Sequence, residues 1–206
     1  MPIVQPADME SLVAAINRGE VVAIPTDTVY GLAARADDAA AVARIAEAKG
    51  RSAEQPTQLL VSSIEAIAPY LEDPAALDRV RPFWPGAVTA IVRVRPGFAD
   101  AVVTRAGTVG VRVPDDALAI AVIEACGGAL AASSANRHGE APALTAEEVA
   151  AAFGEALLIL DGGPRLGGMA STVVDLASGP PRLLRAGPVS ARDLGIPEPG
   201  TADGPS

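Results

Sequence analysis

Apolar residues recur along the chain with two spacings, one typical of helices and one typical of buried strands. Helical spacing covers residues 8–18 and 38–49, and short apolar runs typical of strands cover residues 21–24 and 59–61. Asp8 and Asp38 stand at the start of the helical segments, where an aspartate is expected to cap a helix. Further strands are predicted at residues 88–94, 108–113, 130–133, 157–160, 172–175 and 182–185, and further helices at residues 64–71, 74–81, from 115 or 116 to 127, and from the capping box at 145–148.

These elements predict an α/β fold with a mixed sheet flanked by helices. Strands separated by helices favour parallel crossover connections, whereas Ser178-Gly-Pro-Pro181 between the last two strands suggests an antiparallel hairpin. A length of 206 residues, half of them hydrophobic, suffices for one domain, which we place at residues 1–194. Residues 195–206 are rich in proline, glycine and small polar residues, so we expect a disordered tail there.

The composition limits the classes of partner. The net charge is −9 and aromatic residues make up 3% of the chain, which argues against a surface that holds nucleic acid through many phosphate contacts and stacked bases. A few arginines in a cleft would still hold a polyanion at short range. No basic segment leads into an apolar stretch, and no window of about 18 residues is free of charged and turn residues, so we expect a soluble, cytoplasmic protein.

The chain has a single lysine, Lys49, against fifteen arginines, and it lies two residues before Arg51. A lone lysine suggests a position that requires a compact ammonium group rather than a planar guanidinium group. The alternative is structural, because Lys49 ends a predicted helix and Gly50 is typical of the residue after a helix. A cation there would neutralise the last carbonyl groups of the helix. The position alone leaves both interpretations open.

Two loops carry polar groups directly after predicted strands. Thr26, Asp27 and Thr28 follow residues 21–24, a common place for ligand sites in α/β folds, although a local network of backbone hydrogen bonds would also explain them. Residues 133–136, Ser-Ser-Ala-Asn, follow another strand and offer hydroxyl and amide groups that can bind carboxylate or phosphate oxygens. Such clusters are also common in turns, so neither loop alone defines a site.

An arginine is expected on the polar face of one strand. In residues 108–113 the period of two places Thr108, Gly110 and Arg112 on one face and three valines on the other. Residues 161–172 are rich in glycine, but they have neither the Walker nor the dinucleotide-binding spacing. No cluster of metal ligands is evident, so a divalent ion would arrive bound to phosphates.

Seven short motifs follow one another along the chain. They are Pro25-Thr-Asp-Thr-Val-Tyr-Gly31, Lys49-Gly-Arg51 with Pro56, Phe83-Trp-Pro-Gly86, Val111-Arg-Val-Pro114, Ser133-Ser-Ala-Asn136, Ser171-Thr-Val-Val-Asp175 and Leu184-Arg-Ala-Gly187. Together, over residues 3–194, they resemble the YrdC/TsaC-type threonylcarbamoyl-AMP synthases. The resemblance implies a twisted, YrdC-like mixed sheet with a positively charged concave face. It also implies a nucleotidyltransferase that forms L-threonylcarbamoyl-AMP and pyrophosphate from L-threonine, bicarbonate or carbon dioxide, and ATP.

The resemblance also assigns roles to residues, and for Lys49 it favours the catalytic interpretation. Such a reaction needs aligned reactants and fixed positive charge at the phosphate oxygens. Many members have asparagine where this chain has Gln55 and histidine where it has Leu60. The resemblance implies that threonine is bound by Thr28, Arg112, Ser134 and Ser171, that ATP is bound by Lys49, Arg51, Gln55, Thr108, Asn136 and Arg185, and that Lys49 and Arg51 are the catalytic pair.

The implied product serves the threonylcarbamoyladenosine modification of tRNA, so the expected partners are downstream tRNA-modification proteins, with weak direct RNA binding at most. ATP is expected as a substrate with Mg²⁺ on its phosphates, and no tightly bound cofactor is expected. Two alternatives remain. A HypF-type carbamoyl-adenylate enzyme would need cysteine-rich zinc modules, and this chain has one cysteine. A non-catalytic RNA-binding module is disfavoured by the pI of about 4.6.

Overall fold

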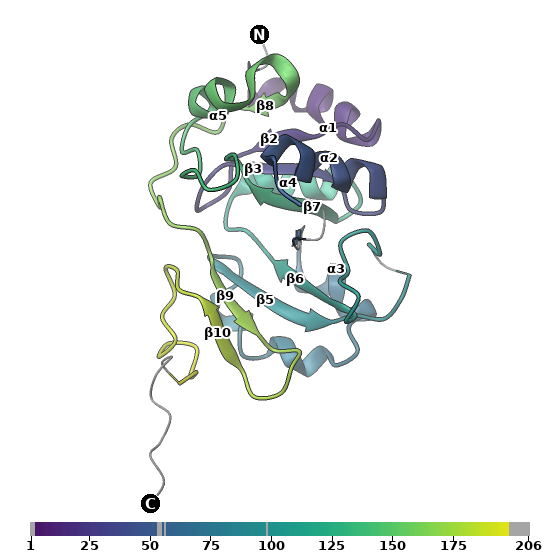
Figure 1. Ribbon diagram of the computed structural model, residues 1–206, viewed down its shortest axis with the longest axis vertical. Helices are drawn as coiled ribbons and strands as arrows, with labels where there is room; N and C mark the ends of the chain where they lie inside the picture. Colours follow the sequence, from purple (N-terminus) through teal and green to yellow (C-terminus); the bar gives the residue numbers. More distant parts are fainter. Residues whose placement is uncertain (1–2, 53–54, 56, 98, 198–206) are drawn as a thin grey trace, which may run out of the picture.

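The computed structural model describes residues 3–52, 55, 57–97 and 99–197, and its strands form one ten-stranded sheet with helices packed around it (Figure 1). The strands are β1 (Ile3–Val4), β2 (Val22–Ile24), β3 (Gly31–Arg35), β4 (Gln58–Val61), β5 (Val88–Arg93), β6 (Thr108–Arg112), β7 (Ala129–Ser134), β8 (Leu158–Leu160), β9 (Thr172–Asp175) and β10 (Arg182–Arg185). The helices are α1 (Met9–Asn17), α2 (Ala39–Lys49), α3 (Ile64–Ile67), α4 (Ala117–Ala125) and α5 (Ala146–Phe153), with 3₁₀ helices at Pro6–Asp8, Ala68–Tyr70, Pro74–Leu77, Arg81–Phe83 and Gly154–Ala156.

The sheet is mixed, as predicted. Its strands lie in the order β1–β8–β2–β3–β7–β4–β6–β5–β9–β10. The pairs β1–β8, β2–β8, β4–β6 and β5–β9 are parallel, the other neighbouring pairs are antiparallel, and β9 with β10 forms the predicted hairpin. Figure 1 shows the strong twist of the sheet, which places β2, β3, β7 and β8 in the upper part of the molecule and β5, β6, β9 and β10 in the lower part.

The two faces of the sheet carry separate apolar clusters. On one face, Val22, Ile24 and Leu60 pack with residues of α1 and α4. On the other face, Ala23 and Leu59 pack with residues of α2 and α5. Successive strand residues point to opposite faces, so a strand covered on both sides needs a continuous apolar run. This explains why residues 21–24 and 59–61 show no polar alternation.

Polar side chains cap four of the described α-helices, but one predicted cap is absent. The side chains of Asp38, Ser63, Asp116 and Thr145 accept backbone N–H groups from the first turn of α2, α3, α4 and α5, respectively. The prediction that Asp8 caps α1 is wrong, because its side chain accepts no capping hydrogen bond. Asp8 ends a 3₁₀ turn and has φ −104° and ψ 18°, whereas a capping residue normally has an extended backbone.

Two strands were not predicted, and two predicted helices are shorter. β3 has the sequence Gly-Leu-Ala-Ala-Arg, which lacks β-branched residues, and its strand conformation follows from pairing with β2 on one side and β7 on the other. β1 has two residues and extends the edge of the sheet beside β8. The helix predicted at residues 74–81 is a 3₁₀ helix at Pro74–Leu77, and the one at 64–71 changes to a 3₁₀ helix at Ala68–Tyr70, which has Pro69 in its first turn.

The packed part of the chain extends beyond the predicted boundary at residue 194. Ile196 is buried in the core, and Nη1 of Arg79 donates to the carbonyl oxygens of Leu194 at 2.6 Å and Gly195 at 3.0 Å. Residues 198–206 lie outside the described residues, so disorder of the tail stays a prediction. None of the helices in the described part of the chain is long and apolar enough to cross a bilayer.

Candidate active site

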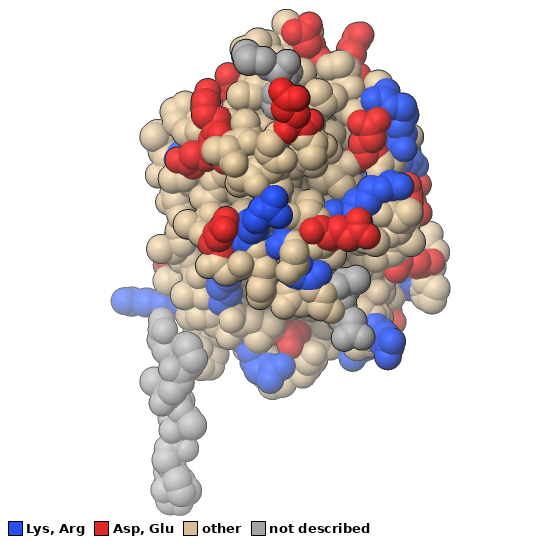
Figure 2. Space-filling model, turned by 45° about the horizontal axis from the view of Figure 1, so that its top comes forward, with Lys and Arg blue, Asp and Glu red and all other residues tan. Residues whose placement is uncertain are grey.

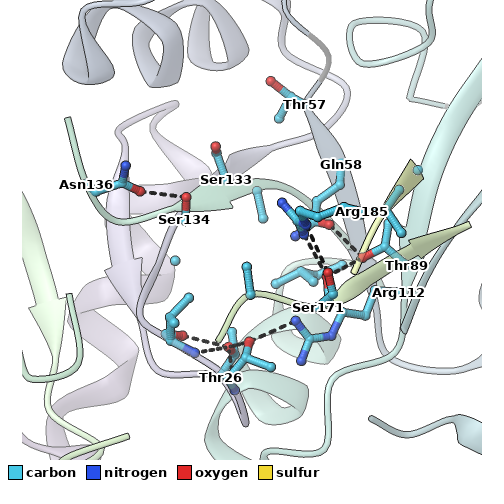
Figure 3. Close-up of a pocket in the computed structure, with 18 of the residues that line it drawn as sticks. Thr26, Thr57, Gln58, Thr89, Arg112, Ser133, Ser134, Asn136, Ser171 and Arg185 are labelled. Carbon is cyan, nitrogen blue, oxygen red and sulfur yellow. Dashed lines mark hydrogen bonds between the residues drawn. The ribbon is translucent and has the colours of Figure 1, made fainter. Parts of the chain in front are cut away.

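A cavity of about 370 Å³ opens on the sheet face that α1 and α4 cover elsewhere, and its size is within the range of small-molecule sites (Figure 3). Leu60 and Ala132 lie where the apolar cluster under α1 and α4 meets the cavity, because both residues belong to that cluster and also line the cavity. The lining residues come from strands β4, β5, β6, β7 and β10, the loop before β3 and the first residue of β3, the end of α2 and the segment after it, the loop after β7, and the residues around the start of β9. Segments far apart in the chain therefore meet at one place.

All of the predicted site residues except Thr108 line this cavity. Gly110 and Arg112 both face it, as the alternation in β6 predicted. Thr108 begins the same strand but lies outside the lining, and its Oγ1 is 2.7 Å from Oγ1 of Thr104. Gln55 lines the cavity and is exposed, while Pro56 of the same motif lies outside the described residues. A contact of Thr108 with ATP stays a prediction.

The cavity is cationic although the protein is acidic. Lys49, Arg51, Arg112 and Arg185 line it, and none of the described lining residues is aspartate or glutamate. Burial lowers the pKa of all three arginines, and for Arg185 repulsion by Arg112 adds to the effect. On the face shown in Figure 2, by contrast, acidic and basic side chains are interleaved. The cavity therefore concentrates positive charge where an anionic ligand would lie, and the charge of the whole concave face stays a prediction.

Lys49 is buried, with 5% of the residue exposed, and its ammonium group faces the end of β7 rather than the end of its own helix. Nζ donates to the carbonyl oxygens of Ser134 at 2.5 Å and Asn136 at 2.8 Å, and to Oδ1 of Asn136 at 3.1 Å. Gly50 ends α2 in the left-handed conformation with φ 64°, as expected. The helix-end interpretation is thus right about the backbone and wrong about the partners of the ammonium group.

The burial of Lys49, together with its predicted role in binding ATP, predicts opposite pH dependences for ATP affinity and for the free energy of unfolding. Burial, with a smaller repulsion by Arg51, lowers the pKa of Lys49 from 10.5 to about 8, while the oxygen acceptors of Ser134 and Asn136 favour the ammonium form. Affinity for a non-hydrolysable ATP analogue is therefore expected to fall as pH rises through about 8. Between about 8 and 10.5 the unfolded state binds more protons at this residue than the folded state, so its contribution makes the free energy of unfolding rise with pH.

The affinity is checked by calorimetric titration with the analogue at several pH values between about 7 and about 9.5. The affinity of the wild type should fall at least about fivefold over this range. Lys49→Arg keeps its charge throughout and is the control, because its affinity should be independent of pH in this range. Equal pH dependence in the two proteins would assign the effect to another group.

The guanidinium group of Arg112 is fixed by three neighbours. Nε donates to the carbonyl oxygen of Gly86 at 2.9 Å, Nη1 to Oγ1 of Thr28 at 3.0 Å, and Nη2 to Oδ1 of Asp27 at 2.5 Å. The Arg112 side chain is 3% exposed and that of Asp27 is 15% exposed, so this is a buried ion pair. A guanidinium group has five N–H donors, and with the described residues three of them are used, so one donor on each terminal nitrogen can bind an anionic ligand such as a carboxylate.

Local hydrogen bonds shape both polar loops. Oγ1 of Thr26 donates to the carbonyl oxygen of Val29 at 2.6 Å and lies 3.1 Å from Oγ1 of Thr28, so the local-network interpretation holds for Thr26. On the opposite wall, Oγ of Ser134 donates to Oδ1 of Asn136 at 2.6 Å. Each loop is therefore both a local hydrogen-bond network and a wall of the cavity, because the internal bonds fix hydroxyl and amide groups that line the cavity.

The glycine-rich stretch packs against a neighbouring loop. A Cβ atom at Gly167 would lie 3.2 Å from the carbonyl oxygen of Thr28 and 3.3 Å from that of Asp27. Only Ala170 and Ser171 of residues 161–172 are among the described lining residues. The glycines thus allow close packing of two loops, and the stretch does not form a phosphate loop.

The sequence analysis missed several polar lining residues. Nη2 of Arg51 donates to Oγ1 of Thr57 at 2.8 Å, and Oγ1 of Thr89 donates to Oε1 of Gln58 at 3.0 Å. The lining residues that were not predicted and carry polar side chains include Thr57, Gln58, Thr89 and His138, whereas Thr26 and Ser133 belong to the two candidate loops but were assigned no ligand. Gln58 shares a strand with Leu60, so a period of two along β4 would have indicated its face.

The chain belongs to the Sua5/YciO/YrdC family, because the model of that family, described as "Telomere recombination", matches residues 14–187. The threonylcarbamoyl-AMP synthase of Bacillus subtilis is 41% identical over 187 residues, which are 88% of this chain and 54% of the relative. That of Chromohalobacter salexigens is 42% identical over 175 residues, 81% of this chain and 91% of the relative. Sua5 of Pyrococcus abyssi, solved in complex with L-threonine, matches with a TM-score of 0.86 and 34% identity over 93% of this chain and 59% of that chain. The resemblance seen in the seven motifs is confirmed.

No group of three or more histidine, cysteine, aspartate and glutamate side chains that could hold a metal ion occurs among the described residues. The cavity offers cationic and hydroxyl groups, which suit phosphate and carboxylate oxygens. The arrival of a divalent ion on the phosphates of a nucleotide stays a prediction.

Proposed function

We propose that this protein is an L-threonylcarbamoyladenylate synthase, which forms L-threonylcarbamoyl-AMP and pyrophosphate from L-threonine, bicarbonate or carbon dioxide, and MgATP. The observation that carries the proposal is the convergence of four cationic side chains and several hydroxyl groups in one cavity without a described acidic lining residue. The relatives from B. subtilis and C. salexigens bear the name of this activity, and the P. abyssi relative binds L-threonine.

Threonine lies at the Arg112 side of the cavity in this proposal. The two available N–H groups of Arg112 bind its carboxylate, and Thr28, Ser134 and Ser171 bind its amino and hydroxyl groups. Arg112 is held rigidly, so it loses little conformational freedom when threonine binds. The neutral amino nitrogen attacks the carbon of carbon dioxide, which bicarbonate supplies after protonation and loss of water, and the nitrogen releases a proton to solvent, which gives a carbamate.

In this proposal ATP binds beside the other three cationic side chains, those of Lys49, Arg51 and Arg185. The carbamate oxygen attacks the α-phosphorus, the bond from that phosphorus to the bridging oxygen of pyrophosphate breaks, and pyrophosphate leaves with its Mg²⁺. Lys49 and Arg51 stabilise the charge on the phosphate oxygens, and Arg185, Asn136, Gln55 and Thr108 hold the nucleotide. Each such preorganised donor contributes about 3 kcal/mol to transition-state stabilisation.

The product is an activated carbamoyl group, which serves the threonylcarbamoyladenosine modification of tRNA. We place this chemistry in the cytoplasm, with separate tRNA-modification proteins as consumers of the product. Direct binding of RNA is expected to be weak, because the net charge of −9 disfavours extended phosphate contacts.

Pyrophosphate release tests the proposal, with the nucleotide product identified by mass spectrometry. Release is expected only when ATP, threonine and bicarbonate are all present, and the product should have the mass of threonylcarbamoyl-AMP. Release at the full rate without threonine would reject the synthase activity.

A further inference from the structure

A chain of hydrogen bonds crosses the floor of the cavity from β4 to β10 (Figure 3). Oγ1 of Thr89 donates to Oε1 of Gln58 at 3.0 Å and lies 2.8 Å from Oγ of Ser171. Arg185 donates to Ser171 twice, from Nη2 to Oγ at 3.1 Å and from Nε to the backbone oxygen at 3.0 Å. Thr89 and Ser171 are each 2% exposed, so these bonds have little competition from water.

The hydrogen bond between Gln58 and Thr89 needs the space that Gly110 leaves between them. In the order β4–β6–β5, Gln58 and Thr89 lie on strands separated by β6, so they meet above Gly110. A Cβ atom at Gly110 would lie 3.2 Å from Cγ2 of Thr89 and 3.6 Å from Cβ of Gln58. Gly110 has no positive φ that would require glycine, so the close approach of these two side chains is the reason for a small residue here.

The number of protons on the hydroxyl groups decides which group donates in each hydrogen bond of this series. A hydroxyl group has one proton and two acceptor lone pairs. Thr89 gives its proton to Gln58, so the proton in the 2.8 Å contact must come from Ser171. Ser171 then donates to Thr89 and accepts from Arg185, which leaves one lone pair for a ligand.

We propose that Gln58 and Thr89 are positioning residues that orient the Ser171 hydroxyl as an acceptor for the amino acid. Ser171 then accepts a hydrogen bond from the amino or hydroxyl group of threonine and does not donate to a carboxylate or phosphate. Both hydrogen bonds of Arg185 go to Ser171 and neither goes to Thr89, so the guanidinium group of Arg185 keeps them when Thr89 is changed. This inference rests on the proposed function, because it takes threonine as the ligand at Ser171.

Thr89→Val tests the inference, because it keeps the shape of the side chain and removes the hydroxyl group. The dissociation constant for threonine, measured by calorimetry with a non-hydrolysable ATP analogue present, is expected to rise about tenfold, as for the loss of one hydrogen bond. The KM for ATP should stay within about threefold of the wild type, and Thr89→Ser should restore most of the threonine affinity. Gly110→Ala should weaken threonine binding in the same direction, because its Cβ would push Thr89 aside.

Thr172→Val is the matched control. Thr172 is adjacent to Ser171, fully buried and outside the described cavity lining, and its Oγ1 donates to the carbonyl oxygen of Val189 at 2.7 Å. This variant should lower thermal stability and leave threonine affinity unchanged. Wild-type affinity in Thr89→Val, or equal loss in Thr172→Val, would overturn the inference and leave the synthase activity untouched. Absence of threonine binding in the wild type would overturn the proposed function itself.

Discussion

Lys49→Met is expected to lower turnover by at least about a hundredfold, which corresponds to the loss of one preorganised charge at the phosphates. Methionine has a similar length but no charge and no donor. Lys49 also bonds the backbone oxygens of Ser134 and Asn136, so the variant leaves buried acceptors without their donor. We therefore expect the free energy of unfolding to fall by about 1–3 kcal/mol as well.

Two further variants separate the loss of charge from the loss of stability. Ile45→Val shortens a fully buried side chain on the same helix and should cost about 1 kcal/mol while turnover stays near the wild-type value. Lys49→Arg keeps the charge but not the shape, and should stay at least about tenfold below the wild type. Turnover of Lys49→Met within about threefold of the wild type, at full occupancy of the folded state, would refute a catalytic role.

Asp27→Ala is expected to lower the free energy of unfolding by about 3–5 kcal/mol, because it leaves the guanidinium group of Arg112 buried without its carboxylate. The KM for threonine should also rise at least about tenfold, because the guanidinium group of Arg112 loses one of the three hydrogen bonds that fix its orientation. Urea unfolding measures the stability, and steady-state kinetics at saturating ATP measures the KM.

Asp37→Ala is the control for an exposed ion pair. Nη2 of Arg35 lies 2.5 Å from Oδ2 of Asp37, but the Asp37 side chain is 63% exposed, so its loss should cost less than about 1 kcal/mol. The double variant Asp27→Ala/Arg112→Met should recover part of the stability, because no charge is left buried, without recovering threonine binding. Equal costs for Asp27→Ala and Asp37→Ala would contradict this account of the buried pair.

The sequence predicted the site residues better than the contacts among them. Alternation in β6 correctly placed Gly110 and Arg112 on one face, and the position of Ser134 after a strand was recognised. Gln58 and Thr89 were missed, because the reason for their meeting is the strand order β4–β6–β5, which the order along the chain does not reveal. The partner of Arg112 was missed for a similar reason, since Asp27 and Arg112 are far apart in sequence.

The fold was predicted where local signals agree with tertiary packing. Apolar runs located β2, β4 and β8, because sheets covered on both faces need such runs. β3 was missed because its alanine-rich sequence has little intrinsic preference for a strand, and pairing with two neighbours decides its conformation. The roles of individual residues toward threonine and ATP came from the resemblance to a family, since composition and periodicity carry no such information.

A crystal structure with L-threonine and a non-hydrolysable ATP analogue tests the central claim most directly, namely that scattered segments build one site for both substrates. The account predicts the threonine carboxylate within about 3 Å of the Arg112 terminal nitrogens, and a phosphate oxygen at similar distance from Lys49 or Arg51. Threonine bound outside the cavity, or phosphates bound away from both Lys49 and Arg51, would contradict it.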